Sequence, residues 1–137
     1  MARSSSSNTF SNLPPYGALI LRLALGVCML HHGYSKVVPD GAMDHYAHYI
    51  VSLGLPYWLG YVSALTEFAG GILLLLGLLT RIAAGLIAIN MLVAFIEVGI
   101  HQGAGTSELI GLVFAIAVAV ICFGGGAYAL DQKIGFA

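Results

Sequence analysis

Residues 57–81 read YWLGYVSALTEFAGGILLLLGLLTR, and this stretch is apolar for long enough to cross a lipid bilayer. Glu67 stands near its middle, roughly 15 Å from Tyr57 at about 1.5 Å of helical rise per residue. A single charged side chain at the centre of a bilayer costs at least about 2.5 kcal/mol. Glu67 must therefore be protonated, paired with a cation or open to a water-filled cavity.

The chain as a whole has the composition of a membrane protein. Of its 137 residues, 59% are hydrophobic and 8% are charged, and the apolar residues form long runs. We expect an all-α fold, an integral membrane bundle of four transmembrane helices, with spans at about residues 16–33, 57–79, 82–101 and 107–123. We expect no separate soluble domain, and no basic patch or phosphate-binding glycine motif indicates a nucleic acid or nucleotide as partner.

The segments outside the spans are short. Residues 1–15 are serine-rich and end in a Pro-Pro pair, which predicts a disordered cytoplasmic tail that is not cleaved, and residues 132–137 are expected to form a second cytoplasmic tail. Apolar residues recur at helical spacing over 43–51 and predict an extracytoplasmic interfacial helix with Asp40 as its N-cap. On the fourth span, small residues predict close helix packing: Gly111, Ala115 and Ala119.

The positively charged residues predict how the chain is oriented. With four spans both termini lie on one side of the membrane, and that side holds Arg3, Arg81 and Lys133, whereas the other side holds Lys36 alone. Both termini are therefore predicted to be cytoplasmic, in a membrane that we expect to be the bacterial inner membrane. All the histidines and two acids then fall near the outer face: His31, His32, His45, His48, His101, Glu97 and Glu108.

The first candidate site is an ion pair between the first two spans. Arg22 and Glu67 differ in depth by about 6 Å from helical rise, a gap that an Arg side chain can bridge. Lys36 lies four turns beyond Arg22 and shares its inward face. Two interpretations stay open: the pair fixes only the helix register, or Arg22 controls the charge of a proton-transferring Glu67.

The second candidate site is a cluster near the outer face. Its members are expected to be His32, Glu97, His101 and Glu108, with Tyr57 and Tyr61 on the neighbouring span; Asn90, Glu97 and His101 fall on one inward stripe of the third span. Reduction of a quinone needs two protons as well as two electrons, and His or Glu side chains near the membrane surface can supply the protons. The competing interpretation is that these residues are ordinary interfacial side chains.

A metal site competes for the same residues. Glu97 and His101 are one helical turn apart, and His32 could join them to give three ligands for zinc or copper. His45 and His48 could also hold a metal or haem, although a solvated helix face explains them as well. No single segment carries a recognisable metal motif.

Six short phrases follow one another along the chain: RLALG (22–26), HGYSK (32–36), LGLP (53–56), EFAGG (67–71), LLGLLTR (75–81) and YALD (128–131). In their order and spacing they resemble the DoxX family of small four-helix membrane proteins, over residues 16–131. Members resemble membrane subunits of quinone-linked oxidoreductases such as thiosulfate:quinone oxidoreductase, and others accompany sulfur-transfer or oxidative-stress systems. The resemblance implies quinone as cofactor and four catalytic-site residues: Arg22, His32, Lys36 and Glu67.

The chain itself offers no electron carrier. It contains no flavin, haem or dithiol motif, and Cys28 and Cys122 differ by about 15 Å in depth, too far for a disulfide. The electron donor must therefore be a bound cofactor or a soluble or membrane redox partner protein. The leading hypothesis is a quinone-dependent oxidoreductase subunit. The alternatives are a non-enzymatic anchor for soluble redox enzymes and a metal-binding membrane protein; each is compatible with a homo-oligomer.

Overall fold

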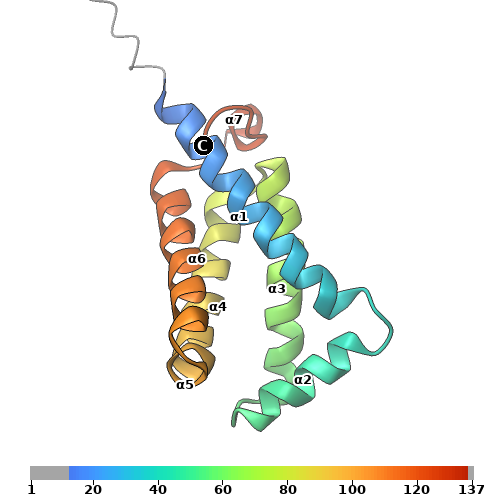
Figure 1. The fold of residues 1–137 in the computed structure, drawn as a ribbon. Coiled ribbons are helices and arrows are strands. Elements are labelled where there is room, and N and C mark those ends of the chain that lie inside the picture. Colours follow the sequence, from blue (N-terminus) through green and yellow to red (C-terminus); the bar gives the residue numbers. More distant parts are fainter. Residues whose placement is uncertain (1–12, 136–137) are drawn as a thin grey trace, which may run out of the picture.

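The computed structural model describes residues 13–135, which form helices and connecting loops without any strand (Figure 1). Most of the predicted N-terminal tail, residues 1–12, and the last two residues lie outside this range. The helices are α1 (Pro14–Val37), α2 (Ala42–Ser52), α3 (Tyr57–Leu76), α4 (Thr80–Ala94), the π-helical η2 (Phe95–Gly99), α5 (Ile100–Gln102), α6 (Ala104–Phe123) and α7 (Asp131–Ile134).

Four helices are long and apolar enough to cross a membrane, and they confirm the expected transmembrane bundle. They are Pro14–Val37, Tyr57–Leu76, Thr80–Gln102 and Ala104–Phe123. The third of these is continuous through α4, η2 and α5. The protein is therefore an integral membrane protein in contact with the lipid bilayer.

The first helix is longer at both ends than the sequence suggested. It begins at Pro14 because proline at the first helical positions lacks only an N–H that would have no partner there. It also continues past Gly33 to Val37, so Lys36 belongs to the helix. Figure 1 shows α1 running obliquely across the bundle, with its start beside α7 and its end next to α2.

The short helix α2 lies at the end of the bundle opposite to α7 (Figure 1). It buries Ala47 and Ile50, in agreement with the predicted amphipathic pattern. The prediction that Asp40 caps this helix was wrong: Gly41 occupies the N-cap position with a left-handed φ of 71°, and no side chain caps the helix. Glycine adopts that conformation without the steric cost that a side chain would add.

The four spans form two closely packed pairs, α1 with α3 and α4 with α6. In the first pair, glycines bring the two backbones together: a Cβ atom on Gly71 would lie 2.5 Å from the backbone nitrogen of Leu30, and one on Gly33 would collide with the backbone of Phe68. The second pair buries Val113, Ala117 and Val120 of α6 in the core that α4 shares. The predicted Gly111, Ala115 and Ala119 stripe is therefore not the buried face of this helix.

Candidate functional site

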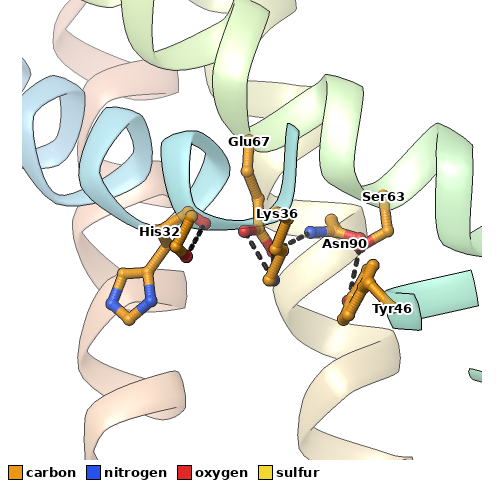
Figure 2. A network of polar contacts seen from close by, with 7 residues as sticks. His32, Lys36, Tyr46, Ser63, Glu67 and Asn90 are labelled. Carbon is orange, nitrogen blue, oxygen red and sulfur yellow. Dashed lines mark hydrogen bonds and ion pairs between the residues drawn. The ribbon is translucent and has the colours of Figure 1, made fainter. Parts of the chain in front are cut away.

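The cation that pairs with Glu67 is Lys36. The Lys36 Nζ atom lies 2.7 Å from Oε1 and 2.6 Å from Oε2 of Glu67, and the Glu67 side chain is only 4% exposed (Figure 2). The predicted Arg22–Glu67 pair was wrong. Because Gly33 packs directly on the backbone of Phe68, the last turn of α1 runs against α3 next to Glu67, and the Lys36 side chain reaches the carboxylate from there.

Three further side chains extend this ion pair into a network. Asn90 donates a hydrogen bond from Nδ2 to Glu67 Oε1 over 3.1 Å. The Lys36 ammonium lies 4.3 Å from the ring centroid of Tyr46, a cation–π contact, and the Tyr46 hydroxyl is 3.1 Å from the hydroxyl of Ser63. Helices α1, α2, α3 and α4 thus each contribute to one polar network (Figure 2). Its pairing and hydrogen bonds offset the cost of placing two charges inside the bundle.

Arg22 is buried at the other end of the bundle and holds backbone carbonyls. Its Nη1 atom donates to the carbonyls of Leu74, 2.7 Å away, and Leu75, 3.1 Å away, which lie in the last turn of α3. Its Nε and Nη2 atoms donate to the carbonyls of Gly125, at 2.8 Å, and Ala127, at 3.4 Å. A cation at a helix C-terminus is favourable because the carbonyls there lack intrahelical partners. Arg22 therefore ties the loop after α6 to the end of α3.

Asp131 completes this second network. Its buried carboxylate accepts hydrogen bonds from the backbone N–H groups of Leu79, at 2.6 Å, and Thr80, at 2.8 Å, where α4 begins. In the sequence, Asp131 is notable only as the last residue of the phrase YALD (128–131). An acid that follows a glycine-rich loop after the last span is the signal that could have indicated a cap for a neighbouring helix.

Two cavities flank the Lys36–Glu67 network, and both lie between the α1–α3 pair and the α4–α6 pair. The Asn90 cavity, of about 160 Å³, is bounded by α2, α3, α4 and η2, and its polar lining includes Ser63, Asn90 and Glu97. The His32 cavity, of about 260 Å³, is lined by His32, Lys36 and Glu67 and by apolar residues of α1, α4 and α6. The two cavities share four lining residues: Tyr46, Tyr49, Ala94 and Val98.

The structure separates the members of the predicted outer cluster. His32 lines one cavity, but Figure 2 shows its imidazole pointing away from the Lys36–Glu67 pair. Glu97 lines the other cavity from η2, a π-helical turn of the kind often found at functional sites. His101 is exposed and lines neither cavity. Tyr61 also lines neither cavity, and its hydroxyl lies 3.3 Å from that of Tyr57.

The three-ligand metal site, which was one of the alternatives, does not assemble. Within residues 13–135, no three His, Cys, Asp or Glu side chains lie close enough to hold a metal ion, so His32, Glu97 and His101 remain apart. His48 instead lies 3.6 Å from Asp44, one turn away on the exposed face of α2. The same Asp44 carboxylate accepts a hydrogen bond from the Tyr57 hydroxyl.

Three members of the Lys36–Glu67 network were not predicted as site residues. Asn90 was placed on an inward stripe, but nothing in the sequence paired it with Glu67. Ser63 precedes Glu67 by one helical turn, and this spacing is a signal that could have placed it on the same face. Tyr46 offered no signal, because it lies on the apolar face of α2 and reads as an ordinary packing residue.

Comparison with known proteins agrees with this architecture. The DoxX family matches over residues 17–102, which include Arg22, Lys36, Glu67 and Asn90. The Bacillus subtilis (strain 168) protein named "Putative oxidoreductase CatD" is 33% identical over 119 residues, a match that covers 86% of this chain and 87% of that protein. No solved structure matches the chain significantly. The chain belongs to the DoxX family.

Proposed function

We propose that this chain is a membrane subunit of an oxidoreductase and that it exchanges reducing equivalents with a membrane quinone. Membership of the DoxX family and the name of the Bacillus subtilis relative support the general part of this proposal, that the chain is a membrane protein associated with an oxidoreductase. The choice of a quinone as the cofactor is based on the chemistry of the site. The sulfur or oxidative-stress substrate belongs, in this proposal, to a partner protein.

The observation that carries the proposal is the Lys36–Glu67 ion pair in the wall of the largely apolar His32 cavity, linked through Asn90 to the neighbouring Asn90 cavity. A cavity of about 150 Å³ is large enough to bind benzene, so each of the two can accept a single aromatic ring. Their apolar walls suit a ring that arrives from lipid, while Lys36 and Asn90 offer N–H donors that suit carbonyl oxygens. The residues present therefore fit a quinone head group.

Reduction of a quinone to a quinol consumes two electrons and two protons. Lys36 and Glu67 are titratable groups within hydrogen-bond distance of each other, and they can hold and pass on a proton at the wall of the His32 cavity. Asn90 orients the Glu67 carboxylate by donating to Oε1. The electrons come from the partner protein, because the sequence carries no flavin, haem or dithiol motif.

The test is to extract the full-length protein in mild detergent and to measure the quinone that copurifies. The double variant Lys36→Met/Glu67→Leu removes both charges, so neither is left buried without a partner, and we expect it to fold. Its quinone content should fall at least about tenfold, the effect of losing one hydrogen bond to a charged group. The matched control Lys133→Met/Asp40→Leu removes one cation and one acid that are both exposed, and it should retain the quinone.

Other outcomes contradict the proposal. If the folded double variant retains as much quinone as the wild type, the ion pair is not part of the binding site. If the wild type copurifies with redox enzymes but contains no quinone, the chain is a non-enzymatic anchor for those enzymes.

A further inference from the structure

At the end of the bundle that holds Arg22 and α7, a polar cavity continues into an apolar groove. The Arg81 cavity, of about 260 Å³, is lined by Arg81, Asp131 and the glycine run 124–126. The Gly17 groove, of about 440 Å³, is lined by Gly17, Ile20, Leu21 and Phe123 among others. The two hollows share three lining residues: Pro14, Ala18 and Phe123. One elongated molecule with a polar end and an apolar end could therefore occupy both.

The polar end holds one exposed cation, Arg81, and one buried acid, Asp131. Arg81 is exposed and makes no ion pair or side-chain hydrogen bond with any other residue in the range 13–135. Its guanidinium group lies against Gly124, where an added Cβ atom would be 3.4 Å from Nε. The nearby Asp131 carboxylate is already engaged by the backbone N–H groups of Leu79 and Thr80. The free group at this site is thus a cation whose planar N–H donors match a phosphate.

The position of the site in the bundle matches the headgroup region of a bilayer. Exposed Tyr16 and Tyr128 rings contact each other at this end, with centroids 6.5 Å apart, as in the aromatic belts that mark a membrane interface. From that level the Gly17 groove follows α1 to Ile20 and Leu21, which lie about one turn further along the span. The polar Arg81 cavity therefore lies at the level of lipid headgroups, and the apolar Gly17 groove lies at the level of the acyl chains.

We propose that this surface is a binding site for an anionic phospholipid, with the lipid phosphate on Arg81 and one acyl chain in the Gly17 groove. A lipid is the occupant that fits, because a free phosphate ion would leave the apolar groove empty. The site lies at the opposite end of the bundle from the Lys36–Glu67 network, and its occupation does not depend on the proposed quinone function.

The experiment titrates phosphatidylglycerol into the full-length protein in detergent and counts bound lipid by native mass spectrometry. Arg81→Gln should weaken phosphatidylglycerol binding about fivefold, the contribution of one cation near an anionic surface. Gly17→Leu fills the groove, since an added Cβ atom there meets no other atom within 4 Å, and should weaken binding about tenfold by displacing roughly two methylene groups.

Two matched controls isolate these effects. Lys133→Gln removes an exposed cation of α7 that does not line the Arg81 cavity, and Gly85→Leu makes the same change as Gly17→Leu at another open position. Both should bind phosphatidylglycerol like the wild type. Phosphatidylcholine should bind the wild type and both controls more weakly than phosphatidylglycerol does. Circular dichroism checks that each variant is folded.

Three results would overturn the proposal. If Arg81→Gln and Lys133→Gln bind phosphatidylglycerol equally well, Arg81 does not contact the lipid phosphate. If inorganic phosphate displaces the lipid and Gly17→Leu has no effect, the site holds a free anion. If the wild type is a dimer that Gly17→Leu converts to a monomer without changing lipid binding, the groove is covered by a second copy of the chain.

Discussion

The two cations of α1, the buried Arg22 and the partly buried Lys36, have separate roles, although the sequence places them on one face of the helix. Lys36 neutralises Glu67, whereas Arg22 donates only to backbone carbonyls. Helical rise alone made an Arg22–Glu67 pair reasonable. In the structure α1 runs obliquely across the bundle (Figure 1). Arg22 therefore lies at the end of α3, where it donates to Leu74 and Leu75, and Lys36 is the cation that reaches Glu67. Such a helix tilt depends on packing against neighbours and cannot be derived from spacing within one span.

Arg22 should therefore matter for stability. Arg22→Leu leaves the carbonyls of Leu74, Leu75 and the loop after α6 without their donor, and we expect it to lower the free energy of unfolding by about 3 kcal/mol. The measurement is a denaturant titration of the protein in detergent, followed by circular dichroism. Lys133→Leu, which removes an exposed cation at the same end, should change the stability little. An unchanged midpoint for Arg22→Leu would show that water satisfies these carbonyls equally well.

At the scale of helices, the positions of the four spans could be predicted from the sequence, but the contacts between the spans could not. The long apolar runs and the single interfacial helix follow from hydropathy and helical periodicity, both of which are local properties of the chain. Close helix packing was expected at Gly111, Ala115 and Ala119 of the fourth span, but the tight glycine contacts between spans lie between α1 and α3. Small residues occur on most of these helices, and the sequence does not specify which small residues face which partner.

The glycine contact between α1 and α3 predicts that a larger residue at Gly71 destabilises the protein. Gly71→Ala would place a Cβ atom 2.5 Å from the Leu30 nitrogen, so the helices must separate, at a cost of about 1–3 kcal/mol. Thermal unfolding in detergent should show the loss. Gly85→Ala introduces the same methyl group where no atom lies within 4 Å and should be neutral or slightly stabilising. Equal stability of the two variants would mean that α1 and α3 adjust without cost.

The two ends of the molecule carry different sets of polar residues. The Lys36–Glu67 network and its cavities lie toward α2, whereas Arg22, Asp131 and the proposed lipid site lie toward α7. Because Lys36 is neutralised by Glu67, the α2 end offers no cation in the described range that is free of an acid partner, whereas Arg81 and Lys133 are exposed at the other end. In cations without an acid partner, the two ends therefore differ more than a count of Lys and Arg residues suggests.

This asymmetry predicts that both termini are cytoplasmic and that the cavities open toward the outer side, since positive loops are retained in the cytoplasm. In a bacterial host, a fluorescent protein fused to the C-terminus should fluoresce, whereas alkaline phosphatase fused there should be inactive. Adding cations at the opposite end, in Val38→Lys/Asp40→Lys, should produce a mixed orientation in which part of the population exports the phosphatase. Val38→Gln/Asp40→Asn, at the same exposed positions, should keep the wild-type orientation. If phosphatase fused to the wild-type C-terminus is active, the molecule is inverted, and the redox partner would then meet the Lys36–Glu67 cavities from the cytoplasm.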